Sequence, residues 1–435
     1  MTGPARLQEA VGALRERPLP AAGKGLGLLT AAGPVTTASL AARRLSLFGP
    51  ELAMPLLVLK QDALAHNIGA MARYCAEAGV QLAPHGKTTM APQIVARQIE
   101  AGAWGVTAAT ISQVQVFREF GVERVLLANE LTEPAAAGWL AAELAADPGF
   151  DCYVYADSRD GVRLLAEGAQ AGGTDGARPL PVLVELGQRG GRTGCRSAEQ
   201  AEAVASAVTA APGLRLAGVA GYEGSIGHDR EPATVAEVTA FCRELRALAA
   251  RLPPLPAGQD PYLVTAGGSL YFDTVVAELT APAGPGPAPV VVLRSGAYVT
   301  HDHGIYARLT PAAQPGGTGP ALIPALELWA RVLSAPEPGL AIAGAGRRDA
   351  PFDQGFPVPL RIRLADGQEV DAAGLRVTAL DDQHAYLQLP AGCELHPGDL
   401  VCLGISHPCT AFDKWQLIPV VDEDYRVTDV VRTFF

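Results

Sequence analysis

The chain has 435 residues, of which 49% are hydrophobic and 18% are charged, and its formal net charge is -11. This length and apolar content are sufficient for a large core and for about two or three domains. The acidic balance argues against nucleic acid or an anionic membrane as a partner, since either would require a basic face, and it favours small solutes as ligands.

The first predicted unit is an N-terminal extension over residues 1–50. It holds one amphipathic stretch, 7–14, followed by a region rich in Gly, Ala and Pro around 21–34. We expect this extension to pack on the main fold. From Pro55 the pattern becomes regular, because the apolar run 56–59 predicts a strand and apolar residues then recur at helical spacing.

Strands and helices alternate through the next unit, residues 51–310. Barrel strands are predicted at 81–84, 105–108, 124–128, 152–155, 182–186, 216–221, 263–265 and 290–293. About eight βα units in roughly 240 residues are the count and size of a (β/α)8 TIM barrel, whose catalytic groups lie at the carboxyl ends of the strands. An open doubly wound sheet is the alternative.

A second domain is predicted over residues 311–435. The Gly- and Pro-rich run 311–320 interrupts the alternation and predicts a connection. Beyond it, short β-branched or alternating runs are separated by turn dipeptides such as Asp366-Gly367 and Pro397-Gly398. This pattern indicates a domain of mainly antiparallel β strands.

The motif Ala83-Pro84-His85-Gly86-Lys87-Thr88-Thr89 closes the first predicted barrel strand. The chain contains only four lysines: Lys24, Lys60, Lys87 and Lys414. Lys87 is the one at the carboxyl end of a barrel strand, where such folds place their chemistry. An exposed loop lysine is the ordinary alternative, but His85 on the same strand face favours a functional role. If any lysine forms a Schiff base with pyridoxal phosphate, Lys87 is the best placed.

Two further motifs follow strands in the middle of the barrel. The Gly-rich loop 185–194 carries two arginines, among them Arg192, which are suited to holding a phenolate or carboxylate oxygen. An ordinary mobile loop of the same composition is about equally expected. Tyr222 and Glu223 close another strand and place a phenol and a carboxylate near the mouth.

The last two barrel strands also end in motifs. Gly267-Gly268-Ser269 lies between a strand and a helix, so its backbone N–H groups can approach a phosphate at the positive end of that helix. A simple turn is the alternative. Arg294-Ser295-Gly296-Ala297-Tyr298 closes the last strand. His301 and His303 follow it, and their spacing suits a metal site or a structural role equally.

A candidate metal site lies far away in the sequence, at His407 and Cys409. One imidazole and one thiol, separated by a single proline after a strand, can converge on one ion. Zinc suits this N/S pair, and two protein ligands would leave positions open for water or substrate. A packed turn of the β domain is the alternative.

Together these motifs resemble the fold-type III pyridoxal-phosphate enzymes, which join an alanine racemase-like barrel to a β domain. Within them the chain is similar to the metal-dependent D-serine dehydratase and D-threonine aldolase branch, including its longer D-amino-acid deaminase subgroup. The resemblance covers about residues 50–435. It rests on Pro84-His85-Gly86-Lys87-Thr88, Ala266-Gly267-Gly268-Ser269, Gly296-Ala297-Tyr298 and His407-Pro408-Cys409.

The resemblance implies a role for each motif. Lys87 is expected to be the catalytic residue and to carry the cofactor, Arg192 to neighbour the cofactor's O3′ oxygen, and Arg294 to face its pyridine nitrogen. The expected cofactor-binding residues are Lys87, His85, Arg192, Tyr222, Gly267, Gly268, Ser269, Arg294 and Tyr298. The expected ligands of Zn²⁺, or alternatively Mn²⁺, are His407 and Cys409.

The reaction implied by the resemblance is dehydration of a D-3-hydroxy amino acid such as D-serine, giving a 2-keto acid and ammonia. Dehydratases of this branch carry His-x-Cys, whereas its aldolases typically carry His-x-Asp, so Cys409 favours elimination. Retro-aldol cleavage of the D-threonine aldolase type is the nearest alternative. A non-enzymatic pyridoxal-phosphate carrier is a second alternative, which the β domain and the His-x-Cys pair disfavour. No counterpart of the racemases' second-domain tyrosine is recognised.

The expected compartment is the cytoplasm. Seven cysteines are scattered without a CxxC pair, and their odd number makes a disulfide framework unexpected. We recognise neither a secretory leader nor an apolar stretch that would span a membrane. We expect the β domain to reach the barrel mouth, a contact that the partner subunit makes in many fold-type III enzymes, and we therefore expect a homodimer.

Overall fold

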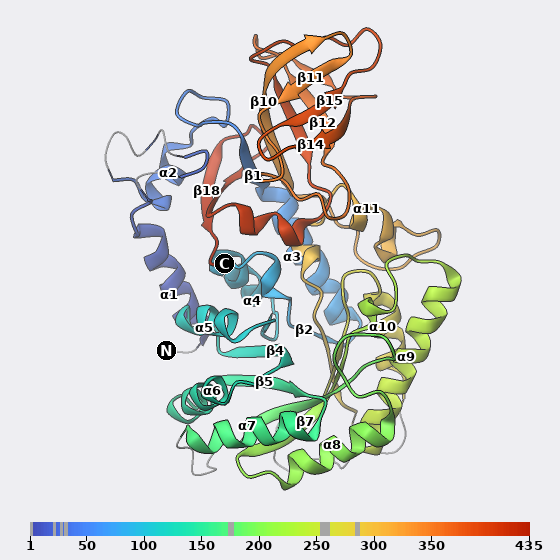
Figure 1. The fold of residues 1–435 in the computed structure, drawn as a ribbon. Helices are drawn as coiled ribbons and strands as arrows, with labels where there is room; N and C mark the ends of the chain where they lie inside the picture. Colours follow the sequence, from blue (N-terminus) through green and yellow to red (C-terminus); the bar gives the residue numbers. More distant parts are fainter. Residues whose placement is uncertain are drawn as a thin grey trace.

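The computed structural model describes residues 3–20, 23–26, 29, 34–172, 178–252, 262–282 and 288–435. Eight parallel strands form a curled sheet in the order β2-β9-β8-β7-β6-β5-β4-β3, and a bridge between His85 and Thr107 closes it into a TIM-like barrel (Figure 1). The strands are β2 (Gln81–Leu82), β3 (Val106–Ala108), β4 (Arg124–Glu130), β5 (Asp151–Ala156), β6 (Leu180–Leu186), β7 (Leu214–Gly221), β8 (Leu263–Ala266) and β9 (Val290–Leu293). The eight predicted barrel strands are therefore confirmed.

Helix α3 (Gln61–Glu77) leads into the barrel, and the helices after it connect successive barrel strands. These connecting helices are α4 (Pro92–Glu100), α5 (Ile111–Glu119), α6 (Pro134–Ala146), α7 (Arg159–Ala171), α8 (Ala198–Ala210), α9 (Pro232–Arg251) and α10 (Phe272–Leu279). Side-chain oxygens of Thr110, Ser158 and Ser197 cap α5, α7 and α8 by accepting a backbone N–H of the first turn. Proline begins α4, α6 and α9, where its missing N–H would have no helical partner.

The second unit is a ten-stranded, mainly antiparallel sheet. Its main path runs β13-β12-β16-β10-β1-β17-β18, and β11, β15 and β14 branch from β10. Only the pair of β1 and β17 is parallel among the described pairs of this sheet. The strands are β1 (Leu56–Lys60), β10 (Leu326–Glu337), β11 (Leu340–Ala343), β12 (Val358–Arg363), β13 (Glu369–Asp371), β14 (Arg376–Leu380), β15 (Ala385–Gln388), β16 (Leu400–Gly404), β17 (Leu417–Val421) and β18 (Val427–Arg432).

Strand β1 lies in this second sheet, although the sequence analysis assigned residues 51–310 to the barrel. Leu56 pairs with Trp329 of β10, and Leu59 pairs with Val420 of β17. The run is apolar throughout and buried on both faces, as expected for a central strand. Its pattern predicted a strand correctly, but no local pattern tells which sheet a strand will join.

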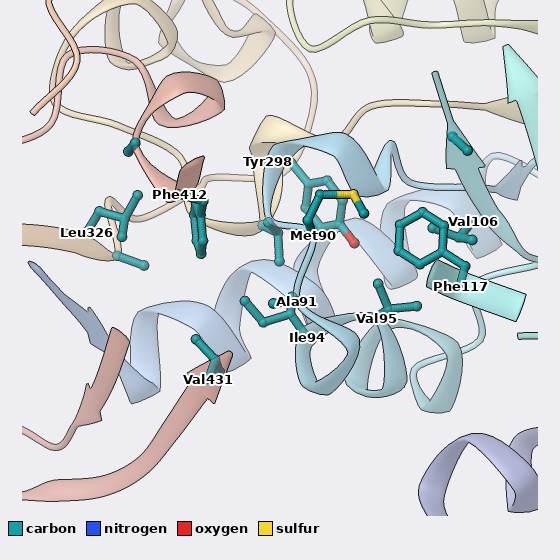
Figure 2. Close-up of a cluster of buried hydrophobic side chains, with 14 of the residues drawn as sticks. Met90, Ala91, Ile94, Val95, Val106, Phe117, Tyr298, Leu326, Phe412 and Val431 are labelled. Carbon is teal, nitrogen blue, oxygen red and sulfur yellow. The ribbon is translucent and has the colours of Figure 1, made fainter. Parts of the chain in front are cut away.

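A shared core fixes the β domain on the barrel (Figure 2). Met90 and Ile94, at the start of α4, lie in one buried cluster with Phe412 and Val431 of the C-terminal region. A backbone hydrogen bond of 2.9 Å from Phe434 N to Met90 O supports the same contact. The segment that follows Lys87 is therefore part of the junction between the two units.

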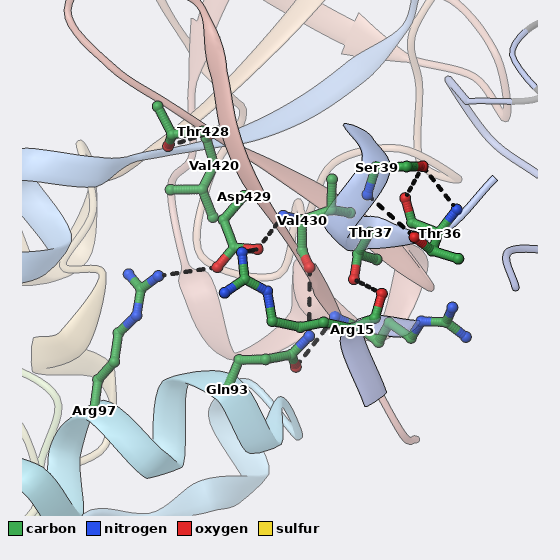
Figure 3. Close-up of polar contacts among 11 residues, drawn as sticks. Arg15, Thr36, Thr37, Ser39, Gln93, Arg97, Val420, Thr428, Asp429 and Val430 are labelled. Atoms are coloured by element: carbon green, nitrogen blue, oxygen red, sulfur yellow. Dashed lines mark hydrogen bonds and ion pairs between the residues drawn. The ribbon is translucent and has the colours of Figure 1, made fainter. Parts of the chain in front are cut away.

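The N-terminal helices α1 (Gly3–Glu16) and α2 (Thr37–Arg43) pack beside the same junction (Figure 3). Asp429 of β18 pairs with Arg15 of α1 and with Arg97 of α4, each at 3.3 Å. Gln93 of α4 donates a hydrogen bond to Val430 O at 3.3 Å. These contacts join α1 to β18 of the β domain, and β18 to α4 of the barrel. None of the described helices combines the length and apolar character of a membrane span.

Candidate active site

A cavity of about 490 Å³ opens at the carboxyl ends of the barrel strands. Barrel residues form most of its wall, and the β domain adds Gln354, His407 and Cys409. The predicted site residues in its wall are Lys87, His85, Arg192, Tyr222, Gly267, Gly268, Ser269, Arg294, His407 and Cys409. The fold therefore brings together motifs that are far apart in the sequence.

Lys87 enters the cavity from a short 3-10 turn, η2 (Gly86–Thr88), that follows β2. Gly86 has no room for a side chain, because a Cβ there would lie 2.3 Å from Phe117 Cζ. The glycine lets the backbone pass close to the Phe117 ring. The turn then projects the lysine into the mouth of the barrel.

The surroundings of Lys87 suit an amine that reacts at neutral pH. Burial lowers the pKa of Lys87, the nearby Cys409 thiol opposes this shift, and the guanidinium groups of Arg192 and Arg294 lower the pKa further. A lowered pKa increases the share of neutral amine. Neutral amine is the form that attacks a carbonyl group and that accepts a proton.

Three buried polar atoms in the cavity wall have no hydrogen-bond partner in the described chain. They are His85 Nδ1, Tyr155 OH and Glu185 Oε2. The pKa of His85 lies well below its usual range, first because of burial and then because of the charges on Lys87 and Arg294, so its ring is neutral. Buried polar groups are nearly always paired, so unpaired ones on three residues of one cavity wall suit a site for a polar ligand such as pyridoxal phosphate.

The Gly267-Gly268-Ser269 loop follows β8 and lines the cavity, but its first two amides already have an acceptor. Gly267 N donates to Glu223 Oε2 at 2.9 Å, and Gly268 N donates to Glu223 Oε1 at 2.5 Å. Glu223 begins the short 3-10 turn η3 (Glu223–Ser225) and is fully buried. A Cβ on Gly268 would lie 3.2 Å from Glu223 Oε1, so the glycine permits this close approach. A contact between these amides and a phosphate stays a prediction.

We expect Glu223→Gln to weaken binding of pyridoxal phosphate while the protein stays folded. Glutamine keeps one oxygen acceptor, but its NH₂ group faces the second backbone N–H, which then loses its partner at a cost of about 1–3 kcal/mol. Because the cofactor binds the loop shape that both bonds hold, a cost of that size to this shape appears as a rise of about tenfold to hundredfold in the Kd of the cofactor. Absorbance titration of the cofactor-free protein measures the Kd. Glu231→Gln, at an exposed position before α9, is the matched control, and an unchanged Kd in Glu223→Gln would contradict the role of Glu223.

The two predicted arginines have different surroundings. The guanidinium of Arg192 stacks on the ring of Tyr222, 4.5 Å from its centre. Burial and the charge of a neighbouring carboxylate raise the pKa of Tyr222, so its phenol is neutral. Arg294 is buried and donates to Thr265 Oγ1 at 2.7 Å and to Gly221 O at 2.6 Å. These two bonds hold Arg294 in place at the end of β9, and its approach to a pyridine nitrogen stays a prediction.

Tyr298 does not lie in the site, in contrast to the sequence-based prediction. Its side chain is 2% exposed, belongs to the shared core and does not line the cavity (Figure 2). Gln98 Nε2 donates to its hydroxyl at 2.9 Å. The short turn η4 (Ala297–Val299) presents Ala297 to the cavity and directs the next side chain into the core.

His407 and Cys409 reach the barrel mouth of their own chain. They flank the start of the short turn η6 (Pro408–Thr410), and Cys409 Sγ lies 3.8 Å from the hydroxyl of Thr88, the residue after Lys87. The described residues contain no group of three or more His, Cys, Asp or Glu side chains arranged to hold a metal ion. A metal at this place would therefore have two protein ligands.

Asp353 is a site residue that the sequence analysis missed. Its Oδ2 lies 2.6 Å from Nδ1 of His407, and its Oδ1 accepts a hydrogen bond of 2.8 Å from Thr410 Oγ1. Burial lowers the pKa of His407, but Cys409 and Asp353 outweigh burial and raise it to about 9. A carboxylate on one nitrogen of an imidazole leaves the other nitrogen for a metal. The pair therefore fits a divalent ion, and no sequence spacing connects Asp353 with it.

Tyr306 is a second residue in the cavity wall that was not predicted. It belongs to α11 (Ile305–Leu309), and the centre of its ring lies 6.0 Å from that of His407. Its backbone N–H donates to Asp302 Oδ1 at 3.0 Å, as does that of Ala307 at 3.1 Å. Asp302, between His301 and His303, thus holds the first turn of α11 and positions Tyr306. The described residues do not support a metal site at His301 and His303.

Two carboxyl groups meet beside the cavity. Glu130 ends β4, and Glu185 lies on β6 and lines the cavity. Burial raises the pKa of Glu130, and the nearby carboxyl group of Glu185 and the charge of Asp157 raise it further, to about 9. Since two neighbouring carboxyl groups in a buried site disfavour a second negative charge, this pair carries a proton at neutral pH.

We expect Glu130→Gln to make the protein less sensitive to alkaline pH. The pKa of Glu130 is about 9 in the folded protein, against an ordinary value of 4.5. Its contribution to the free energy of unfolding is therefore complete below about pH 4.5 and is lost as the pH rises through about 9. The side-chain amide of glutamine can donate a hydrogen bond to Glu185 and does not titrate. Thermal unfolding at about pH 6 and about pH 9 tests this, because the midpoint should fall less in Glu130→Gln than in the wild type or in the exposed control Glu133→Gln. Equal falls would contradict the protonated pair.

Comparison with protein families finds two matches. The model of the alanine racemase N-terminal domain matches residues 59–259, and that of the putative serine dehydratase domain matches residues 325–421. The first range covers most of the barrel, and the second covers the part of the β domain that holds Asp353, His407 and Cys409.

Several characterised relatives are similar over long stretches. A D-threonine aldolase of Arthrobacter sp. is 28% identical over 380 residues, which are 86% of this chain and 90% of the relative. A 3-hydroxy-D-aspartate aldolase of Paracoccus denitrificans is 28% identical over 315 residues, 71% of this chain and 75% of the relative. A D-threo-3-hydroxyaspartate dehydratase of Delftia sp. is 27% identical over 172 residues, 39% of this chain and 43% of the relative. The crystal structure of D-threonine aldolase from Filomicrobium marinum superposes with a TM-score of 0.72 at 28% identity, covering 88% of this chain and 95% of that one.

Proposed function

Because the chain belongs to the fold-type III pyridoxal-phosphate enzymes, joining an alanine racemase N-terminal domain to a serine dehydratase-like domain, we propose that it is a metal-dependent lyase of D-3-hydroxy amino acids. The specific reaction proposed is elimination of water from a substrate such as D-serine, followed by uptake of one water that releases ammonia and leaves a 2-keto acid. The relatives named above are aldolases and a dehydratase of D-3-hydroxy amino acids, which supports this substrate class.

One observation carries the proposal: the amine of Lys87 and the His407–Cys409 pair share one cavity, joined by the 3.8 Å contact between Cys409 Sγ and Thr88 Oγ1. When bound, pyridoxal phosphate links covalently to an amine and withdraws electrons from the Cα of an amino acid. The lowered pKa of Lys87 prepares its amine for that link and for taking the α-proton of the substrate. Removing the α-proton is the first requirement of elimination.

The leaving hydroxyl group is the second requirement. A divalent ion on His407 and Cys409 would act there as a Lewis acid. Nitrogen and sulfur ligands suit Zn²⁺, with Mn²⁺ as the alternative. Asp353 orients His407 for this task through the 2.6 Å contact with its Nδ1. Tyr306, a neutral phenol because burial raises its pKa well above its usual value, stands beside His407 as a donor for hydrogen bonds.

The remaining assignments concern the cofactor. Arg192, which stacks on Tyr222, would hold its O3′ oxygen, and Arg294 would face its pyridine nitrogen. Ser269 would hold the phosphate, next to the glycine loop that Glu223 shapes. His85, whose neutral ring has an unpaired Nδ1, completes the wall next to Lys87.

Retro-aldol cleavage is the second candidate function, because it would use the same lysine, metal and β-oxygen and differs only in the bond that breaks. Two of the relatives named above catalyse it. Cys409 favours elimination, because dehydratases of the branch resemble this chain in carrying His-x-Cys. A non-catalytic cofactor carrier would have no use for the His407–Cys409 pair at the cavity.

Product analysis separates these functions. The purified protein, loaded with pyridoxal phosphate and Zn²⁺, is incubated with D-serine, D-threonine and D-3-hydroxyaspartate in turn. We expect ammonia and the matching 2-keto acid. Glycine, together with formaldehyde, acetaldehyde or glyoxylate respectively, would instead identify an aldolase. Retention of the cofactor without turnover of any substrate would identify a carrier.

A homodimer and a cytoplasmic location complete the proposal. The exposed aromatic side chains of Phe352 and Phe356 flank Asp353 and would be covered by a second subunit. All seven cysteines are free of disulfide bonds, which supports a reducing compartment.

A further inference from the structure

Lys24, in the N-terminal segment, contacts two segments of the β domain at once. Its ammonium nitrogen lies 2.8 Å from Asp349 Oδ1 and donates to the backbone oxygens of Arg348 at 2.5 Å and Lys414 at 3.3 Å. It also lies 4.3 Å from the centre of the Trp415 ring. A single cation therefore joins two stretches of chain that are far apart in the sequence.

Asp349 depends on this cation. Its side chain is 0% exposed. Apart from the ion pair with Lys24, its Oδ1 has no polar partner within the described chain. The other oxygen accepts a hydrogen bond of 3.0 Å from Gly346 N. A buried carboxylate is strongly unfavourable unless a positive charge compensates it. The position of the Lys24 ammonium therefore determines where the loop around Asp349 can lie.

One joined stretch leads to Asp353, which contacts His407, and the other leads to Cys409. Asp353 follows Asp349 in the same loop, and Pro351 between them restricts the backbone. On the other stretch, Cys409 is connected to Trp415 by η6 and the short turn η7 (Phe412–Lys414). Trp415 Nε1 donates a hydrogen bond of 2.9 Å to Asp349 O, which connects the two stretches. Lys24 contacts both of these residues.

The segment that carries Lys24 is itself fixed on the β domain. Gly25 has φ of +71°, and a Cβ there would lie 2.2 Å from Leu56 Cδ1 of β1. Ala53 N donates to Gly25 O at 2.9 Å, and the neighbouring Leu26 is 2% exposed. The lysine is thus held on a central strand of the sheet rather than on a free arm.

We infer that Lys24 is a positioning residue for the metal pair: by holding Asp349 and Trp415, it sets the place of Asp353 and thereby the orientation of the His407 imidazole. This inference rests on the proposed function, in which His407 and Cys409 bind a divalent ion. Under this inference the N-terminal segment contributes to the active site, although none of its described residues lines the cavity.

The test is Lys24→Met, which keeps most of the length of the side chain and removes its charge. We expect the Kd for Zn²⁺ to rise severalfold, less than the rise of about tenfold to hundredfold found when a residue in direct contact with a metal ligand is replaced. Competition with a chromogenic chelator measures the Kd, and absorbance of the bound pyridoxal phosphate should stay unchanged. Lys24→Arg, which keeps a cation near Asp349, should restore most of the affinity. A folded Lys24→Met protein with wild-type Zn²⁺ affinity would overturn the inference.

Lys60→Met is the matched control. Lys60 makes the same kinds of contact, with a backbone oxygen (Asp422 O, 3.2 Å) and an aromatic ring (Tyr425, 3.9 Å from its centre), but neither partner lies in the loop of Asp353. Its Zn²⁺ affinity should equal that of the wild type. An equal loss of affinity in both variants would mean that any destabilisation of the sheet weakens the site, and would overturn the inference.

A double variant covers the case in which Lys24→Met does not fold. Lys24→Met with Asp349→Asn removes the buried charge together with its partner, so the loop no longer holds an unpaired carboxylate. We still expect weakened Zn²⁺ binding, because the contacts with Lys414 O and Trp415 are lost. Wild-type affinity in the double variant would overturn the inference.

Proton NMR of the metal-free protein separates this inference from the proposed function. The proton between His407 Nδ1 and Asp353 should give a downfield resonance, which Asp353→Asn removes and so assigns. Lys24→Met should shift or broaden it, and Lys60→Met should not. If the wild type binds no metal, the proposed function fails, yet this resonance still reports whether Lys24 positions His407. An unmoved resonance would overturn the inference.

Discussion

Replacing Lys87 by alanine is expected to abolish turnover and the covalent retention of pyridoxal phosphate. Lys87 is the lysine that projects into the cavity, from a turn at the end of β2. Without its amine, the site loses both the covalent link and the group that takes the α-proton. A positioned acid or base contributes about 10²–10⁴-fold to a rate, so we expect a loss of at least about 10³-fold.

Absorbance after dialysis and trapping with borohydride measure the covalent link directly. Wild-type protein should keep its visible absorption band, and Lys87→Ala should lose it. Lys60→Ala is the matched control, because Lys60 lies in the second sheet, away from the cavity. A borohydride-trapped adduct that persists in Lys87→Ala would mean that another lysine carries the cofactor.

Removing the metal is expected to lower turnover by about 10²-fold or more while the absorbance of the cofactor stays intact. A bound divalent ion supplies several kcal/mol of stabilisation at the leaving oxygen, and each 1.4 kcal/mol corresponds to about a tenfold change in rate. The groups proposed to hold the cofactor, from Lys87 to Ser269, need no ion. Turnover before and after exhaustive chelation, with metal analysis of the same samples, measures the effect. Full activity in protein shown to be free of metal would eliminate this role for His407 and Cys409.

Substituting Cys409 by Asp tests the same pair more finely. A harder oxygen ligand favours Mn²⁺ over Zn²⁺, so we expect the metal that best restores activity to change and retro-aldol products to rise relative to the keto acid. Cys393→Asp is the control, since Cys393 is a partly exposed free cysteine that does not line the cavity. An unchanged metal preference in Cys409→Asp would show that position 409 does not bind the ion.

The barrel could be predicted from the sequence because its signal is local and repeated. Each βα unit joins a short apolar run to a helical pattern, and eight such units leave few alternative folds. The same regularity placed Lys87, Gly267 and Arg294 at strand ends, which in a barrel all meet at one mouth. The antiparallel character of the second domain was likewise visible from its turns and short strands.

The sequence did not show in the same way which strands pair and which side chains pack together. Strand β1 looks like any buried strand, and only its pairing with β10 and β17 shows which sheet it joins. Tyr298 shares a turn with residues of the cavity wall, but the direction of its side chain depends on the core beneath it, where Gln98 binds its hydroxyl. Periodicity describes exposure along one element and does not specify what lies opposite.

The sequence by itself located the groups proposed to react in this protein: one lysine at a strand end, a glycine loop and a His-x-Cys pair, each recognisable from chemistry carried by adjacent residues. Only the tertiary structure decided what prepares those groups. Asp353 contacts His407, Glu223 holds the amides of Gly267 and Gly268, and Lys24 pairs with Asp349. These partners lie far from each other in the chain, and their contacts form because a buried charge or amide must find its counterpart wherever the fold places it.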